Sequence, residues 1–143
     1  MILKTIKEKV EVAAQEFEDA KLQSAANTLI GISRVGNQYL NEKEPWNLIK
    51  TDREKAATIL YVAAQVVKAV AVVSAPFIPA TAEQLWQTLN LSGSVQTSRW
   101  EEALKPLEAG HKIAKAKPLF RKVDVDEKKL DEMLEKVRAA KAL

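Results

Sequence analysis

The feature that most constrains the fold is an apolar stretch at residues 56–78, an almost continuous run of Ala, Val, Ile and Leu. It is long enough to cross a bilayer, which needs about 20 apolar residues. However, Gln65 and Lys68 lie near its middle, and its main component, alanine, drives membrane insertion only weakly. A helix that is apolar on all sides is otherwise found at the centre of a bundle. We therefore predict a buried central helix and no membrane partner.

Helical periodicity continues over most of the chain. Apolar residues recur at three- and four-residue spacing from Ile2 onward, with lysines and glutamates between them. In the second segment, the small residues Ala26, Ser33 and Gly36 would let a neighbouring helix approach closely. We expect helices at Ile2–Phe17, Asp19–Asn41, from about Thr51 to Ser74, Ala80–Asn90, Ser98–Leu104 and Glu127–Ala140.

Local signals set the ends of these helices. Thr51 and Glu54 fit a capping box that begins the apolar helix, and Ser98 and Glu101 fit a second one. Pro76 should end the apolar helix, because proline cannot continue one. For the last helix, Asp124 or Asp126 should be the N-cap.

The predicted fold class is all-α, an antiparallel helical bundle with an irregular C-terminal segment and a final helix. The 143 residues suit one domain. We divide it into a leading helix (1–17), a bundle core (18–90), a loop-rich segment (91–124) and a terminal helix (125–143), with which the bundle ends. Within the third part, residues 119–123 could be extended.

Composition argues against catalysis and metal binding. The chain has no cysteine and one histidine, and it lacks a P-loop, a Gly-rich dinucleotide turn and a nucleophile elbow. The single histidine, His111, follows a glycine and could hold its loop together as an N–H donor. The net charge of +3 permits binding to nucleic acid without requiring it. Residues 1–7 contain no apolar run long enough for a secretion signal, so we expect a cytoplasmic protein.

Pro45 and Trp46 form a corner at the end of the second predicted helix. Proline disfavours helical geometry at the residue before it, so the helix should end here. Trp46 should then have a fixed position at the corner. Four polar residues precede it within two turns, and their spacing places them on one side of the helix end: Arg34, Asn37, Gln38 and Asn41. An amide can read a base edge, an arginine can hold phosphate, and an aromatic ring can cover an unpaired base. Composition and spacing alone favour another role, in which the amides cap the helix and Trp46 fills the core.

A lysine-rich tract follows in the loop-rich segment. It contains Lys112, Lys115, Lys117, Arg121 and Lys122. With Lys43, the first three are our candidates for phosphate contacts. The alternative is that the tract is simply a solvated surface.

Three sequence landmarks resemble one known family. Residues 37–39 (Asn-Gln-Tyr) precede Glu44-Pro45-Trp46, and residues 75–79 (Ala-Pro-Phe-Ile-Pro) end the apolar helix. Residues 110–113 (Gly-His-Lys-Ile) and 118–124 (Pro-Leu-Phe-Arg-Lys-Val-Asp) follow in the same order. Together they resemble the anticodon-binding domain of methionyl-tRNA synthetase, over about Phe17 to Asp126. Related class I synthetases share the first two landmarks, and the glycine-histidine-lysine element favours the methionine family.

The resemblance implies a bundle that holds the CAU anticodon loop of methionine tRNA. In that family the tryptophan after the proline stacks on a splayed anticodon base, which maps onto Trp46. Asn37 and Arg34 would contact or support the loop. The partners would be methionine tRNA and the catalytic domain of the same synthetase, and no DNA is expected.

The chain also departs from the family pattern. The asparagine–arginine pair that reads the first anticodon base lies on a preceding helix, and nothing in residues 1–16 matches it. We do not assign that role to Asn27 or Arg34. The catalytic domain, with its signatures for activating methionine with ATP, is absent, so we expect no cofactor and no ligase activity in this chain alone. Alternative functions are a protein-interaction bundle derived from such a domain, and the equivalent domain of another class I synthetase.

Overall fold

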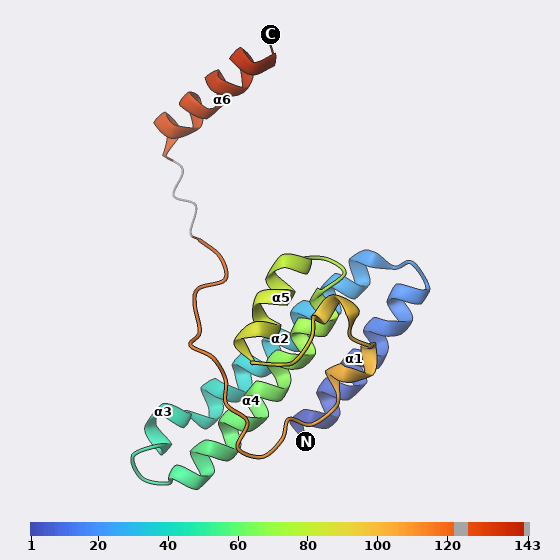
Figure 1. The fold of residues 1–143 in the computed structure, drawn as a ribbon, viewed down its shortest axis with the longest axis vertical. Coiled ribbons are helices and arrows are strands. Elements are labelled where there is room, and N and C mark those ends of the chain that lie inside the picture. The colour runs from blue at the N-terminus through green and yellow to red at the C-terminus, as the bar shows by residue number, and fades with distance from the viewer. Residues whose placement is uncertain (122–125, 142–143) are drawn as a thin grey trace.

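A computed structural model describes residues 1–121 and 126–141 and shows an all-α chain (Figure 1). Within those residues there is no strand, which confirms the predicted fold class. Short 3₁₀ turns, η1 and η2, follow the bundle helices. The elements are α1 (Ile2–Glu18), α2 (Leu22–Lys43), α3 (Pro45–Leu48), α4 (Arg53–Ser74), α5 (Pro79–Thr88), η1 (Val95–Thr97), η2 (Trp100–Ala103) and α6 (Glu127–Lys141).

Helices α1 to α5 form the bundle, and α4 is its centre. Helix α4 contacts α1, α2, α3, α5 and both 3₁₀ turns, while α1 and α2 pack against each other as a hairpin. The second helix begins at Leu22, three residues later than we expected. The reason is a tight turn in which Ala20 has a left-handed backbone with φ of +57°. An L-residue in that conformation cannot continue a right-handed helix.

Helix α4 is a core helix, as its composition predicted. By length and composition it could cross a membrane, but half of its most apolar 18-residue window is buried inside the bundle. Gln65 and Lys68, the two polar residues that argued against a membrane span, are themselves buried there. Core helices of globular domains share this length and apolarity.

Small residues allow α2 and α4 to pack closely, as predicted for Gly36. A methyl group built on Gly36 would lie 2.8 Å from Cγ1 of Val66 on α4, which is closer than non-bonded carbons approach. The two helix backbones can therefore be this close only with glycine at this position.

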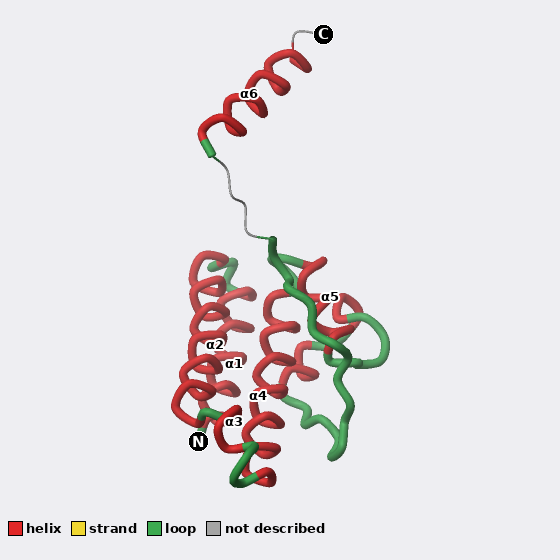
Figure 2. The backbone as a smooth tube through the Cα atoms, turned by 90° about the vertical axis from the view of Figure 1, so that its left-hand side faces the viewer, coloured by secondary structure: helices red, strands yellow, loops and turns green. Residues whose placement is uncertain are grey.

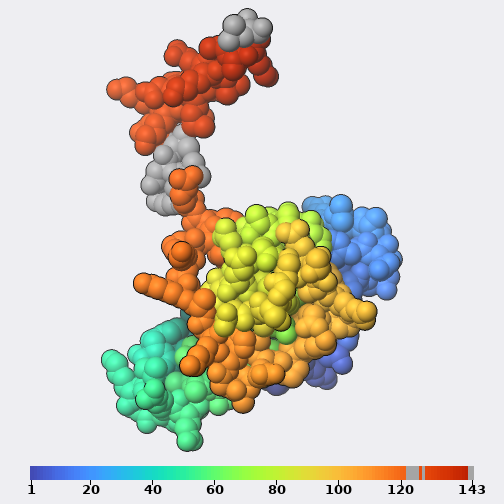
Figure 3. Space-filling view, viewed as in Figure 1, coloured from blue at the N-terminus to red at the C-terminus, as the bar shows by residue number. Residues whose placement is uncertain are grey.

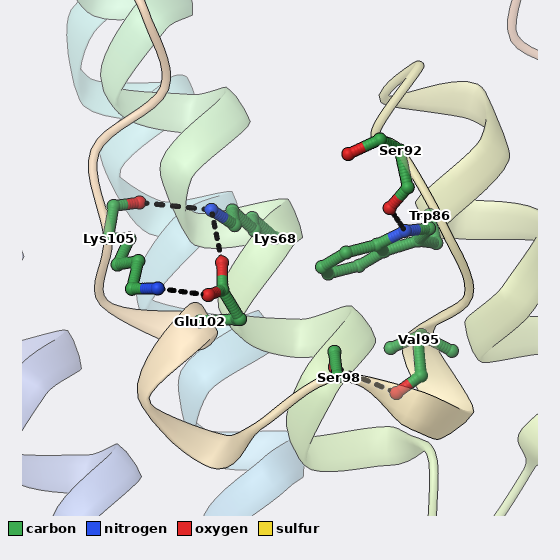
Figure 4. A network of polar contacts seen from close by, with 7 residues as sticks. All are labelled: Lys68, Trp86, Ser92, Val95, Ser98, Glu102 and Lys105. Atoms are coloured by element: carbon green, nitrogen blue, oxygen red, sulfur yellow. Dashed lines mark hydrogen bonds and ion pairs between the residues drawn. The ribbon is translucent and has the colours of Figure 1, made fainter.

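Lys68 is held by a polar cluster at the edge of the core (Figure 4). Its Nζ donates to the carbonyl oxygen of Lys105 at 3.2 Å and lies 3.8 Å from Oε2 of Glu102. The ammonium of Lys105 donates to the other oxygen of Glu102. Burial lowers the pKa of Lys68, and Glu102 opposes that change. The hydrogen bond from Lys105 lowers the pKa of Glu102. The cluster therefore fixes η2 to α4 through one shared carboxylate.

Two predicted caps differ from the structure. Asp52, not Thr51, is the N-cap of α4, and its Oδ1 accepts from the backbone N–H of Lys55 at 3.0 Å. The hydroxyl of Thr51 points back to the carbonyl of Leu48 instead. Likewise, the hydroxyl of Ser98 donates to the carbonyl of Val95, so it does not cap the next turn. That turn is the 3₁₀ segment η2, with Arg99 at its N-cap.

The chain after α5 crosses the bundle and is tied to it at several points. The indole N–H of Trp100 donates to the carbonyl of Val10 on α1, at 3.2 Å. The hydroxyl of Tyr61 on α4 donates to the carbonyl of Leu107 at 2.7 Å. Further along, the N–H of Ala114 donates to the carbonyl of the last residue of α5. We call residues 99–118 the strap, because these bonds hold it across α1, α4 and α5.

Helix α6 (Glu127–Lys141) is the last element of the described chain. It stands apart from α1 to α5 in both views of the backbone (Figures 1 and 2), and its described side chains are exposed. The first turn is capped as predicted, since Oδ1 of Asp126 accepts from the N–H of Lys129 at 2.8 Å. The other candidate cap, Asp124, lies outside the described residues, as do residues 122 and 123 of the stretch that we considered extended.

Candidate nucleic-acid interface

The corner after α2 depends on one residue with an unusual backbone. Glu44 adopts the left-handed conformation, with φ of 43° and ψ of 57°, and its N–H donates to the carbonyl of Leu40 at 2.9 Å. This conformation ends α2 and turns the chain. Pro45 then occupies the first position of the short helix α3. A residue there makes no N–H hydrogen bond within the helix, so the missing N–H of proline costs no bond.

The corner buries its proline and exposes its tryptophan. Pro45 is buried, whereas Trp46 is 52% exposed. The amide of Asn47 donates to the carboxylate of Glu44 at 3.2 Å, which braces the turn from outside. Trp46 therefore does not fill the core, and about half of its surface is accessible to a partner.

Asn37 lies at a second feature, an apolar groove on the bundle surface. The groove has a volume of about 420 Å³ and runs between α2, α4 and α5. Among the described residues, no charged side chain lines it. We call it the α2–α4–α5 groove; its lining residues are Leu29, Ile30, Ser33, Gly36, Asn37, Leu40, Ala63, Val66, Val67, Val70, Ser74, Ile78, Thr81, Leu85, Leu119 and Phe120.

The polar residues at the end of α2 do not all face one way. Asn37 faces the groove, and Arg34 is exposed on the same helix. Gln38 instead donates to Glu42 at 2.8 Å and lines a different hollow beside the start of α1. Lys43 lines that second hollow as well. The structure thus separates Gln38 and Lys43 from Asn37, although helical spacing placed the amides together.

The candidate lysines of the strap lie near α5. Lys115 and Lys117 line a hollow of about 440 Å³ with Gln84, Gln87 and Thr88 of α5. Figure 3 shows this segment, in orange, on the surface of the bundle. Lys112 and Arg121 are exposed, and Lys122 lies outside the described residues. Within residues 1–121 and 126–141, Lys43, Lys112, Lys115 and Lys117 form no ion pair with a carboxylate, and all four residues are exposed.

His111 ties the strap to the end of α5. Its Nε2 lies 2.5 Å from the carbonyl oxygen of Leu89, and Asn90 donates to the carbonyl of Lys112 at 3.2 Å. A carbonyl only accepts, so Nε2 carries the proton, which is the donor role expected from the sequence. In the described part of the chain, no three His, Asp or Glu side chains gather as a metal site would require.

The Lys68 cluster was missed by sequence reasoning. Lys68 served only as an argument against a membrane span, and Glu102 looked like one of many surface carboxylates. The two residues are 34 positions apart, and no periodicity links positions on separate elements. The groove was missed for the same reason, because it is formed by α2, α4, α5 and Leu119 together.

Comparison with known proteins places this geometry in a family. The family described as the anticodon-binding domain of methionyl-tRNA ligase matches residues 1–141. The chain is 37% identical, over 138 residues, to the methionine–tRNA ligase of Metallosphaera sedula, covering 96% of the chain and 24% of the ligase. It is 39% identical over 131 residues to that of Pyrobaculum calidifontis, covering 91% of the chain and 22% of the ligase.

A third relative comes from a different genus. The chain is 39% identical, over 137 residues, to the methionine–tRNA ligase of Christiangramia forsetii, which covers 91% of the chain and 19% of the ligase. It thus spans about a quarter or less of the length of these relatives. The match extends over nearly the whole chain and confirms the resemblance drawn from the three landmarks. The chain belongs to the family of anticodon-binding domains of methionyl-tRNA ligase.

Proposed function

We propose that this domain binds the CAU anticodon loop of methionine tRNA by base stacking and polar contacts. The observation that carries the proposal is Trp46, an indole that is 52% exposed and held outward by a buried proline. Stacking of one base on an aromatic ring contributes about 1–3 kcal/mol and requires an open ring face. The buried Pro45 and left-handed Glu44 fix the backbone that carries the ring before the RNA arrives, which reduces the entropy lost on binding.

Asn37 and Arg34 have supporting roles in this proposal. The carboxamide of Asn37 can donate to and accept from a base edge, and the guanidinium of Arg34 can hold a phosphate. Both are exposed on α2, the helix that leads to the corner. Lys43, Lys112, Lys115 and Lys117 are proposed phosphate contacts, supported by their exposure to water.

In the whole ligase, the domain would contribute binding and orientation to the aminoacylation of methionine tRNA in the cytoplasm. The catalytic domain of the same protein would bind ATP and methionine and would be the second partner. No step of that chemistry is assigned to residues of this chain.

Substitution of Trp46 tests the proposal. The measurement is fluorescence anisotropy of a labelled RNA stem-loop carrying the CAU anticodon, at fixed moderate salt. Trp46→Ala should weaken binding by about 1–3 kcal/mol, whereas Trp46→Phe, which keeps a ring face, should lose less. Circular dichroism and thermal melts of both variants check that the bundle is intact.

Two results would contradict this function. One is equal binding of the unaltered chain to CAU and anticodon-altered stem-loops, which would remove anticodon recognition and favour a protein-interaction role. The other is unchanged RNA affinity in a folded Trp46→Ala variant, which would remove the stacking role.

A further inference from the structure

The α2–α4–α5 groove is an exposed apolar surface without a cover in the described residues. Three large side chains at its rim are strongly exposed: Ile30 by 54%, Ile78 by 41% and Phe120 by 68%. Gly36 and Ser33 also line the groove. Contiguous apolar surfaces of this kind are typical of sites where another apolar element binds.

Helix α6 has an apolar stripe that nothing in the described part of the chain covers. Its four members recur at three- and four-residue spacing and therefore share one face. Helices of this length are marginal in water unless such a face is packed. The four are Leu130 (49% exposed), Met133 (59%), Leu134 (45%) and Val137 (55%).

The groove and α6 are joined by a short stretch of chain. Leu119 and Phe120 already line the groove, and α6 begins at Glu127. Seven residues span at most about 25 Å, and the 15 residues of α6 are about 22 Å long. The stripe of α6 can therefore reach the groove of its own chain without any change in the bundle.

Charge favours the same pairing. The described lining of the groove contains no charged side chain, so a helix that packs into it desolvates no charged group of the bundle. Lys128 and Glu132 of α6 lie on the face opposite the stripe and would remain in water. An apolar stripe with a charged back therefore suits this uncharged groove.

We propose that α6 folds back and packs its apolar stripe, Leu130, Met133, Leu134 and Val137, into the α2–α4–α5 groove of the same chain. This docked arrangement differs from the extended one in Figure 1. The tether favours the chain's own helix over that of a second copy, because a short covalent connection raises the effective concentration of α6 at the groove above that of a helix on another molecule. The proposal does not depend on RNA binding.

Cysteine cross-linking tests the docked arrangement. The chain has no cysteine of its own, so a pair can be introduced without side reactions. Ser33→Cys places one thiol in the groove and Met133→Cys places the other in the stripe. The matched control combines Ser33→Cys with Glu132→Cys, which differs by one position along the tether but lies on the charged face of α6. Under mild oxidation, the first pair should form an intrachain disulfide about tenfold faster than the control.

Each other outcome overturns the proposal. Equal rates of disulfide formation for the two cysteine pairs would mean that α6 meets the groove in no fixed orientation and therefore does not dock. A disulfide formed mainly between chains would assign the groove to a second copy. As a second readout, Leu130→Asp with Leu134→Asp should slow the Ser33–Met133 cross-link to the control rate, while circular dichroism reports an intact bundle. Retention of the fast rate in that variant would show that the stripe is not what docks.

Discussion

At the scale of single residues, the Lys68 cluster shows how a cation is accommodated in the edge of an apolar core. The side chain of Lys68 is 5% exposed, and its charge is met by a carbonyl and by Glu102, whose side chain is 27% exposed. If one partner of such an ion pair is removed, the remaining buried charge has too few opposite charges and hydrogen bonds to offset its loss of hydration. The cluster therefore makes stability dependent on one carboxylate.

The pH dependence of stability follows from the lowered pKa of Glu102. A carboxylate whose pKa is lower in the folded state than in the unfolded chain stabilises the fold. For Glu102 this contribution is complete above pH 4.5, the pKa of the group in the unfolded chain, and it is lost as the pH falls through the lower pKa of the folded state. Glu102→Gln should lower the melting temperature at neutral pH. The melting temperature of this variant should also fall less steeply below pH 4.5, because glutamine has no carboxylate to be protonated at this position. Thermal melts over a pH series measure both effects.

Glu101→Gln is the matched control for this measurement. Glu101 is the exposed neighbour of Glu102, and within the described residues Lys68 donates to Lys105 and not to Glu101. Its variant should keep the melting temperature and acid response of the original chain. If Glu102→Gln behaves like Glu101→Gln, the shared carboxylate contributes nothing to stability.

At the scale of elements, the distance between α2 and α4 is set by Gly36. In the middle of a helix, glycine lowers helix stability by about 1 kcal/mol relative to alanine. Here that loss is offset by the close packing on Val66. The surroundings of Gly31, on the same helix, are looser: a methyl group there would meet the flexible end of Lys9, at 3.4 Å.

The two glycines of α2 should therefore respond oppositely to alanine. Gly36→Ala inserts a methyl group where no space exists, and overpacking costs about 1–3 kcal/mol, which exceeds or cancels the gain in helix propensity. Gly31→Ala should be neutral or stabilising, by up to about 1 kcal/mol. Urea unfolding of the two variants measures the difference. If both substitutions raised the free energy of unfolding, α2 and α4 could move apart without any loss of stability.

At the scale of the whole molecule, the candidate contacts to RNA are spread over the surface. Trp46 lies at the α3 corner, Asn37 at the groove, and Lys115 and Lys117 beside α5. An RNA that touched all of them would extend across several elements. Contacts to phosphate at a distance from the stacked base would raise affinity without reading sequence.

Salt dependence identifies which lysines touch phosphate. Replacing Lys115 and Lys117 by glutamine should reduce the slope of log affinity against log salt by about 0.7–1 for each of the two that binds a phosphate, equally for CAU and altered stem-loops. Lys4→Gln is the control, because Lys4 lies on α1 with its side chain 82% exposed. An unchanged slope in the double variant would leave this tract as a solvated surface.

The sequence predicted those features that depend on local chemistry. The apolar run predicted the core helix, and Pro45, Pro76 and Asp126 set helix ends, because caps and prolines act within one turn. The start of α2 was misplaced because Ala20 adopts a left-handed backbone that its side chain does not favour. Neighbouring hydroxyl and carboxylate groups compete for one cap, and Asp52 rather than Thr51 occupies it.

The candidate site was predicted less completely. The corner follows from Pro45, since proline fixes the backbone at that point. The exposure of Trp46 does not follow from it, because composition and spacing alone favoured a position in the core. The α2–α4–α5 groove and the Lys68 cluster could not be predicted, because each is formed by side chains on separate elements, which no local pattern links. The separation of α6 from the bundle also could not be read from its stripe, which shows only that the helix has an apolar face.

The strap has a consequence for the order in which the chain folds during synthesis. The indole N–H of Trp100 closes onto the carbonyl of Val10, a contact that joins residues 90 positions apart. Helix α1 is made first, yet it gains this bond only after residue 100 has been translated. Contacts of such long sequence separation form late, because the intervening chain must be ordered before they stabilise anything. On the ribosome, α1 can pack against α2 early, but its bond to the strap forms only after nearly the whole bundle has been synthesised.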